Sequence, residues 1–304
     1  MRNFGNLLKQ KIGKIERGPA LIFIAGCLWG SIGLFIRFMS DAGASAEMIS
    51  FLRVAFAFVI LMVITLLRSG ASAFRVSRKT IACSAGLGLI CHGIYNIVYS
   101  WALVRIVVTI SAVLLNVVPV FTAILSAMLF REQITSRKCI AILVNMIGCA
   151  LAVTGGNFSL AALSISGILF GVAAGLCYGL TATFGRLAGE DGDPFLISTY
   201  SYLFAALFLL ICLKPWAVPL TITPAIVGLG FLYALIPTAL GYVLYYRGVQ
   251  ELAENSKAPV IASVETVVTA ILGMAVLGEK LSLLHYMEIA IMMASIMLMK
   301  QKKK

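Results

Sequence analysis

The sequence predicts an all-α integral membrane protein of ten transmembrane helices, arranged as two inverted repeats of five helices. Three observations support this fold class. Hydrophobic residues make up 61% of the 304 residues and charged residues only 12%, whereas a soluble domain carries roughly 25% charge. The apolar residues form long continuous runs, which excludes the alternating pattern of membrane β-barrel strands. Short segments of the first half also recur in the second half.

Each apolar run is close to the roughly 20 residues that cross a bilayer as a helix. Charged or turn residues end the runs, and no stretch between them is long enough for a soluble domain. The expected helices are 19–39, 46–67, 80–104, 107–130, 137–154, 164–186, 195–213, 225–247, 256–277 and 283–299.

The chain therefore divides into two repeats with a short segment at each end. Residues 1–18 are basic and polar and lack the apolar core of a cleavable signal peptide, so we expect the first apolar run to direct insertion. The first repeat is expected over 19–155 and the second over 164–299. A basic tail follows over 300–304.

The two halves share short matches at nearly constant offsets. Because each half has an odd number of helices, the second half must cross the membrane in the opposite sense to the first. This arrangement is typical of secondary transporters, whose substrate sites lie near the middle of the membrane between the repeats. The matching pairs are AGCLWG at 25–30 with AGLCYG at 174–179, TAIL at 122–125 with TAIL at 269–272, and Tyr99 with Tyr245.

The charges predict how the chain is oriented. The 24 lysines and arginines exceed the 12 acidic residues; a basic excess can indicate nucleic-acid binding, but in a membrane protein it marks cytoplasmic loops. With the N-terminus inside, 19 basic residues fall in cytoplasmic segments and three, Arg105, Lys214 and Lys280, in outer loops. We therefore expect both termini in the cytoplasm, the tail against anionic lipid, and no nucleic-acid partner.

Motifs for enzymatic or metal chemistry are missing from the sequence. None of the seven cysteines forms a CxxC pair, and nearly all lie in apolar runs, which indicates packing rather than disulfides or metal ligands. HExxH, GxSxG and P-loop motifs are absent, and His92 and His285 are the two histidines. We expect no catalytic residue, no metal and no cofactor, so that an ion or solute gradient drives any transport.

Several residues in both halves of the sequence resemble a known family. Two tandem EamA domains are similar in order and spacing to these halves, which implies a member of the drug/metabolite transporter superfamily. The resemblance implies ten helices in a bacterial cytoplasmic membrane and movement of small metabolites, often export of amino acids. The residues that carry it are Trp29-Gly30, Tyr99 to Leu103, Pro119-Val120-Phe121-Thr122 and Glu132, with a second copy from Tyr245 to Glu279.

The second copy departs from the family pattern at one position. Many second copies have Glu-Pro in the ninth helix, whereas here Glu265 is followed by Thr266. We therefore expect no kink at Glu265, although Pro259 lies earlier in the same run.

Polar and aromatic side chains in two runs predict a cavity. His92, Tyr95, Asn96 and Tyr99 are spaced three, one and three residues apart, which places them on one helical face. The eighth run, 225–247, carries a comparable face of polar and aromatic residues. Such faces suit a cavity for an amphipathic solute, and the alternative is hydrogen bonding between helices of a closed bundle.

Glu265 lies about ten residues into the ninth run, near the expected midplane. Because an ionisable group in lipid is costly, it indicates function: it can carry a proton or attract an amino group. The alternative is a fixed partnership with Asn116 or Thr269. On an ideal helix Ser263 and Thr266 lie opposite Glu265, so we expect the three not to share a cavity.

Other intramembrane charges are interpreted as structural. Arg53 is close enough to the outer interface to snorkel, so anchoring is favoured over substrate binding. Arg37 and Arg186 are also interpreted as anchors at helix ends, and Glu132 and Glu279 as groups that order loops.

These interpretations predict a carrier for a small-molecule substrate in a lipid bilayer, with amino acids or amine-bearing compounds exported. The oligomeric state stays open, a monomer included. Alternatives are small-drug efflux, or import of a cation such as choline in a cage of Trp29, Tyr178 and Glu265. An enzyme would need a polar cluster facing one surface, and a channel a polar line through the whole thickness. The expected substrate-binding residues are Trp29, His92, Tyr95, Asn96, Tyr99, Asn116, Tyr178, Tyr242, Tyr245 and Glu265.

Overall fold

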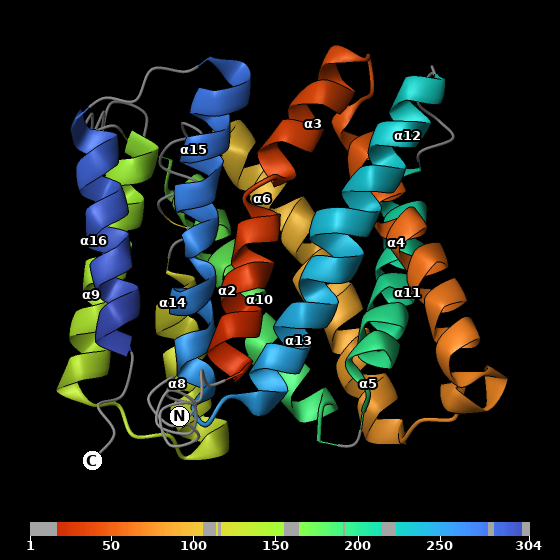
Figure 1. The fold of residues 1–304 in the computed structure, drawn as a ribbon, viewed down its shortest axis with the longest axis horizontal. Coiled ribbons are helices and arrows are strands. Elements are labelled where there is room, and N and C mark those ends of the chain that lie inside the picture. The colour runs from red at the N-terminus through yellow and green to blue at the C-terminus, as the bar shows by residue number, and fades with distance from the viewer. Residues whose placement is uncertain are drawn as a thin grey trace, which may run out of the picture.

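Helices make up the regular structure of the chain in the computed structural model (Figure 1). The structure describes residues 17–105, 114, 117–154, 164–190, 192–214, 223–278 and 283–299. Within these ranges there are α-helices, short 3₁₀ turns and π-helical stretches, and no strand. The expected all-helical class is confirmed, while the segments 1–16 and 300–304 lie outside the described residues.

Among the described residues, seven helices are long and apolar enough to cross a membrane, which makes this a multi-pass membrane protein. They coincide with seven of the expected runs, and the other three expected runs contain the helices α8, α9 and α16. Much of the expected 107–130 run before Val117 lies outside the described residues. The seven candidate spans are Arg17–Asp41, Ala46–Ser69, Arg78–Tyr99, Ile165–Ala188, Pro194–Leu213, Pro224–Glu251 and Asn255–Leu277.

Several spans are built from more than one element. In chain order the elements are α2 (Arg17–Trp29), α3 (Ile32–Asp41), α4 (Ala46–Ser69), η1 (Ala71–Phe74), α5 (Arg78–Gly86), η2 (Leu87–Ile94), α6 (Tyr95–Arg105), α8 (Val118–Phe130), α9 (Ser136–Thr154), α10 (Ile165–Ala188), α11 (Pro194–Leu213), α12 (Pro224–Tyr233), η4 (Ala234–Leu240), α13 (Gly241–Glu251), η5 (Asn255–Lys257), α14 (Ala258–Ala262), α15 (Val264–Leu277) and α16 (Leu283–Met299).

Capping side chains fix where several helices begin. The hydroxyls of Ser45, Ser77 and Thr223 accept hydrogen bonds from backbone N–H groups in the first turns of α4, α5 and α12. The carboxylate of Asp193 does the same at the start of α11, where Pro194 follows. Each cap satisfies an N–H that has no partner within its own helix, so polar residues in the short loops define the helix boundaries.

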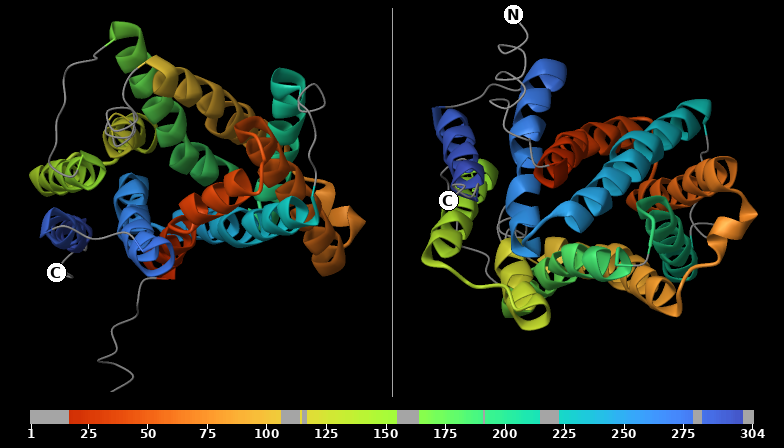
Figure 2. Two further views of the ribbon diagram at one scale, coloured as in Figure 1. Left: turned by 90° about the horizontal axis from the view of Figure 1, so that it is seen from above. Right: turned by 60° about the horizontal axis from the view of Figure 1, so that its bottom comes forward.

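The helices before residue 155 pack against those after residue 164 in matching pairs. α2 packs on α13, α14 and α15, and α10 packs in the same way on α6 and α8. The remaining pairs are α4 with α11 and α9 with α16. Both views of Figure 2 show α9 and α16 side by side at one edge of the bundle. The two halves of the sequence are therefore interleaved rather than separate.

Glycines allow the first span to approach the ninth run closely. A Cβ atom on Gly26 would lie 2.6 Å from the carbonyl oxygen of Ala262, and one on Gly30 would lie 2.9 Å from that of Glu265. Such close contact between backbones is a common use of glycine in membrane helices. It holds the backbone of Glu265 against the end of α2.

Two spans contain π-helical stretches at corresponding places in the two halves. In one span η2 lies between α5 and α6, and in the other η4, which includes Pro237, lies between α12 and α13. A π turn adds a residue to the helical repeat and often marks a functional site. It also rotates the residues that follow relative to those that precede it.

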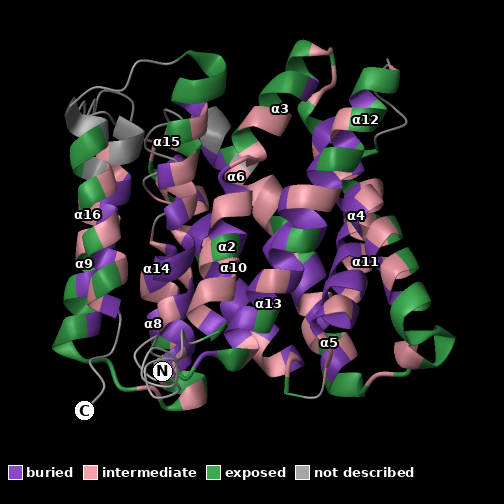
Figure 3. Cartoon of the chain, in the orientation of Figure 1, coloured by how far each residue is buried: buried purple, intermediate pink, exposed green. Residues whose placement is uncertain are grey.

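Burial follows the arrangement expected for a bundle in lipid. The largest buried cluster lies at the centre and includes Trp29, Tyr202, Tyr242 and Tyr246, whereas apolar residues such as Leu67 are exposed on the outside. Figure 3 shows exposed residues on the outer sides of the helices and buried ones between them. Apolar side chains facing outward are what a membrane-embedded surface requires.

Candidate substrate-binding site

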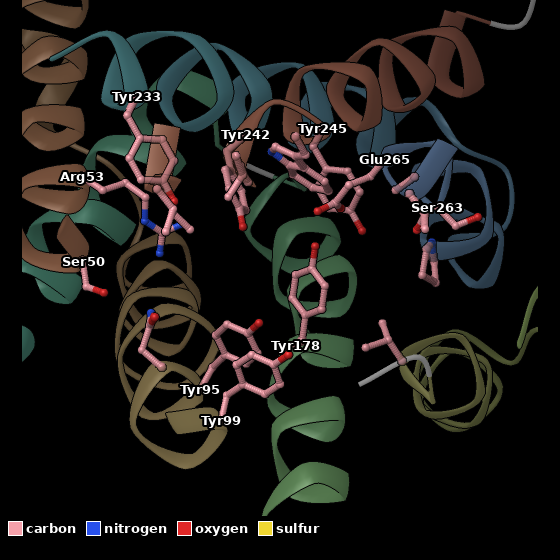
Figure 4. Close-up of a pocket in the computed structure, with 18 of the residues that line it drawn as sticks. Ser50, Arg53, Tyr95, Tyr99, Tyr178, Tyr233, Tyr242, Tyr245, Ser263 and Glu265 are labelled. Atoms are coloured by element: carbon pink, nitrogen blue, oxygen red, sulfur yellow. The ribbon is translucent and has the colours of Figure 1, made fainter. Parts of the chain in front are cut away.

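A cavity of about 470 Å³ lies between the helices and is lined by residues of both halves (Figure 4). Its volume falls within the range of small-molecule sites, roughly 300–1,000 Å³. The lining comes from α2, α3, α4, α6, α8, α9, α10, α12, α13, α14 and α15. The part played by α4 was not expected from the sequence.

The structure brings together eight of the ten expected binding residues at this cavity. His92 is not among the lining residues, and Asn116 lies outside the described residues. The residues that line the cavity are Trp29, Tyr95, Asn96, Tyr99, Tyr178, Tyr242, Tyr245 and Glu265.

His92 lies behind the cavity wall. Its side chain is buried, stacked on Tyr202 with ring centroids 5.0 Å apart and edge-on to Tyr242. Its Nε2 lies 3.4 Å from the hydroxyl of Tyr246. The expectation of one helical face from His92 to Tyr99 assumed an α-helix, whereas His92 belongs to the π-helical stretch η2 and Tyr95 begins α6. The irregular turn separates them.

Aromatic rings form two sides of the cavity. On one side the Trp29 ring lies 4.7 Å from that of Tyr242 and 4.9 Å from that of Tyr245, measured between centroids. On the other side Tyr95 packs against Tyr99 at 5.7 Å and against Tyr178 at 5.5 Å. Because ring faces attract both apolar groups and cations, this lining suits an amphipathic solute.

The backbone breaks immediately before Glu265. α14 ends at Ala262, and the hydroxyl of Ser263 donates to the carbonyl of Val260 at 2.7 Å. The N–H of Thr266 bonds three residues back, to the carbonyl of Ser263 at 3.0 Å. Glu265 thus stands in the first turn of α15, where the helix dipole favours a negative charge.

Two expectations about this segment were wrong. Ser263, Glu265 and Thr266 all line the cavity, because the helix is interrupted and the opposite faces of an ideal helix do not apply. A break also occurs beside Glu265 without the Glu-Pro pair that many second copies carry. The break coincides with the Ser263 hydroxyl bonding back to the carbonyl of Val260, whereas Pro259 stands in the first turn of α14.

The carboxylate of Glu265 has no ion pair and no hydrogen bond within the part of the chain that the structure describes. Thr269, one expected partner, donates instead to the backbone carbonyls of Glu265 at 2.9 Å and Gly30 at 3.1 Å. The other expected partner, Asn116, is not described. Since an unpaired carboxylate is costly away from water, its accessible face in the cavity makes it a candidate ligand-binding group.

Arg53 also lines the cavity, which corrects its interpretation as an interfacial anchor. Its guanidinium carbon lies 5.8 Å from the centroid of the Tyr233 ring. No carboxylate lies within 4 Å of it among the described residues. The sequence contained an indication of this position. Helical spacing places Arg53 on the same face as Ala46 and Ser50, and all three line the cavity.

The cavity reaches the surface at the end of the bundle where α3 and α4 meet. Ile36 is 41% exposed and Ser40 is also exposed, and both belong to the lining. In Figure 1 this end is at the top.

A cluster of buried charges lies at the opposite end, where α8, α10 and α13 finish (Figure 1). Glu132 accepts from Arg186 at 3.1 Å, from the hydroxyl of Ser256 at 2.6 Å, and from the backbone N–H groups of Ser256 and Asn255. Its side chain is only 7% exposed. Glu132 therefore orders the start of the ninth run, and Arg186 is part of a network rather than a lone anchor.

Lysines complete this cluster, which we call the Glu132 cluster: Glu132, Lys138, Arg186, Glu254, Asn255, Ser256 and Lys257. The Nζ atom of Lys138 lies 3.5 Å from Glu132 and 3.0 Å from Glu254, and Lys257 lies 2.6 Å from Glu254. Partial burial acts to raise the pKa of Glu254, but hydrogen bonds from Lys257 and Lys138 outweigh it and hold that pKa below its ordinary value.

A multi-pass helical bundle with a central polar and aromatic cavity is the architecture of a membrane transporter. Residues 16–154 and 165–300 each match the EamA-like transporter family. The chain therefore belongs to this family, with two tandem EamA regions, as its resemblance implied.

Comparison with known proteins gives the same class. A protein of Archaeoglobus fulgidus called an uncharacterized transporter is 26% identical over 286 residues, 92% of this chain and 95% of that protein. YicL of Salmonella typhimurium, called an uncharacterized inner membrane transporter, is 23% identical over 94% of this chain and 96% of its own length. YyaM of Bacillus subtilis, called an uncharacterized transporter, is 28% identical over 54% of this chain and 55% of its own.

A solved crystal structure has the same fold. It superposes with a TM-score of 0.79 at 15% sequence identity and covers 92% of this chain and 95% of that one. At this identity the likeness concerns the fold alone.

Proposed function

We propose that the protein is a secondary transporter that exports small amine-bearing metabolites, amino acids and related compounds first, by alternating access. The observation that carries the proposal is the carboxylate of Glu265, unpaired within the described part of the chain, in a cavity walled by aromatic rings. A carboxylate attracts an ammonium group, and the rings accept the apolar part of the same solute. The binding residues are the eight expected residues that line this cavity.

The proposed architecture is ten crossings in two inverted repeats of five. The seven long apolar spans, together with α8, α9 and α16, supply the ten. Support for the repeat comes from the matching helix pairs, α2 with α13 and α10 with α6, and from the π-helical stretches η2 and η4 in the corresponding spans. In such proteins one repeat rocks against the other around a central site.

The two ends of the bundle support alternating access. The cavity reaches the surface beside Ser40, whereas the Glu132 cluster joins both halves at the other end. With both termini in the cytoplasm of a bacterial inner membrane, as the basic residues favour, this conformation is open to the outside. Opening to the cytoplasm then requires the Glu132 cluster to separate.

Import of choline is the rival proposal, because Trp29, Tyr178 and Glu265 line the same cavity. Arg53 argues against it, since a second positive charge in the cavity opposes a solute that carries only a positive charge. The same repulsion disfavours efflux of cationic drugs.

Uptake into proteoliposomes that contain the purified full-length protein tests this function. We expect labelled phenylalanine to enter faster than into protein-free vesicles, and Glu265→Gln to abolish the difference. The matched control is Glu47→Gln, which removes a carboxylate outside the cavity lining. Uptake of choline without uptake of phenylalanine would replace the proposal with the rival one.

A further inference from the structure

We propose that Arg53 and Glu265 bind the opposite charges of a single elongated zwitterion. On this inference, which rests on the proposed function, the preferred substrate carries its carboxylate and its ammonium group at separate ends. An ω-amino carboxylate or a short peptide has this chemistry. Arg53 thereby becomes a residue that determines substrate specificity.

The first observation is that both charged groups line the cavity without an opposite charge beside them. No ion pair joins Arg53 or Glu265 to another described residue, and both are partly exposed to the cavity. Arg53 and Glu265 are the charged residues among those that line the cavity in the described part of the chain, and nearby Arg37, outside the lining, is paired with Asp41. Two uncompensated charges in a low-dielectric site are costly. A solute with both charges neutralises the two together.

The second observation is their separation. Figure 4 shows Arg53 at one end of a row of aromatic side chains and Glu265 at the other, with Tyr242 and Tyr245 between them. The contacts agree. Arg53 packs on Tyr233, whereas Glu265 is held against Gly30, next to Trp29, which packs on Tyr245.

The helix that carries these rings keeps the two sites apart. Tyr233 is the last residue of α12 and Tyr245 lies in α13, with the π-helical stretch η4 between them. In an α-amino acid both charges are attached to one carbon atom, so its head group can reach one of the two sites at a time. A solute that reaches both must place a chain or ring between its charges.

The third observation is the surface between the two charges. The rings of Tyr242 and Trp29 lie 4.7 Å apart between centroids, tilted by 46°, and both line the cavity. Such a surface accepts methylene groups or a further ring. Together the three parts form a site with a cation at one end, an amphipathic wall, and an anion at the other end.

Binding of matched probes to the purified full-length protein tests the inference. The probes are 6-aminohexanoate, 8-aminooctanoate, the α-amino acid norleucine, hexylamine and hexanoate, and affinity is read from the concentration dependence of the thermal-unfolding temperature. We expect one or both ω-amino carboxylates to bind more tightly than norleucine, hexylamine and hexanoate.

Two variants then test separately how each charged end of the solute is bound. Arg53→Gln should weaken binding of the better ω-amino carboxylate by about 10- to 100-fold, the loss of one charge-assisted contact, and should not weaken binding of hexylamine. Glu265→Gln should weaken hexylamine as well. Arg37→Gln, an arginine paired with Asp41 outside the lining, is the control and should change neither.

Two results would overturn the inference. One is binding of the ω-amino carboxylates that is no tighter than binding of hexylamine. The other is a loss of hexylamine binding in Arg53→Gln equal to the loss of the zwitterion, which would mean a structural role. If amines bind and are transported but either result holds, the inference alone fails. If no amine-bearing probe binds, the proposed function fails with it.

Discussion

Two glutamates of this protein lie inside the same bundle and have opposite surroundings. Glu132 is surrounded by partners, with Arg186, Lys138, a serine hydroxyl and two backbone N–H groups around its carboxylate. Glu265 has none among the described residues and faces the cavity. The difference separates a charge that holds two segments together from a charge that is free to bind a solute.

The largest effect should follow from replacing Glu132 with alanine. This change leaves Arg186 and Lys138 without a carboxylate and orphans the N–H groups of Asn255 and Ser256. Breaking a buried ion pair from one side costs about 3–5 kcal/mol, so the unfolding temperature in detergent should fall by several degrees. Glu251→Ala, which breaks the more exposed pair with Arg247, is the control, and an equal fall in both would contradict the role of Glu132.

Glu265→Gln should have the reverse effect of Glu132→Ala, with little change in stability and a large loss of transport. Since the carboxylate has no partner among the residues that the structure describes, we expect the stability to change by less than about 0.5 kcal/mol, as for a substitution that breaks no contact. Transport should nevertheless be lost, or lose its dependence on pH. Thermal unfolding and proteoliposome uptake of the same preparation measure both properties. Normal uptake at every pH would remove Glu265 from the mechanism.

Tyr99→Ala and Tyr245→Ala should each have a smaller effect on solute binding. Both rings line the cavity, and an aromatic contact contributes about 0.5–1.5 kcal/mol beyond its area, so the dissociation constant should rise severalfold. Tyr245 is also buried against Trp29, and therefore its variant should lose stability as well. Tyr286→Ala, at an exposed site, is the control. Unchanged affinity in both variants would mean that these rings only pack.

The smallest effect concerns the pH dependence contributed by Glu254. Its pKa is lowered from the ordinary value of 4.5 by hydrogen bonds from Lys257 and Lys138, against the effect of burial. The stability it contributes is therefore fully present above 4.5 and is lost as the pH falls through the lower pKa of the folded state. Glu254→Gln should remove about 0.5–1 kcal/mol at pH 7 and flatten the unfolding temperature below pH 4.5. An unaltered acid profile would contradict this.

The sequence predicted the long helices and eight of the residues that line the cavity, because apolar runs and helical spacing are local properties. It failed where the backbone departs from an ideal α-helix. The π-helical stretch turns His92 away from the face of Tyr95, and the break at Ser263 brings Thr266 onto the side of Glu265. The interpretation of Arg53 as an anchor was wrong because the position of a residue along a helix does not reveal which way its side chain points. Two partners of Glu132, Arg186 and Ser256, are more than 50 residues away in sequence, so spacing could not identify them.

Counterflow in proteoliposomes tests the central claim most directly. Vesicles that contain the full-length protein are loaded with a high concentration of an unlabelled amine-bearing solute and diluted into a trace of the same solute in labelled form. A carrier that alternates its cavity between the two sides should accumulate the label transiently above its external concentration, and Glu265→Gln should not. Equilibration without an overshoot in the wild-type protein would indicate an open pore and would contradict alternating access.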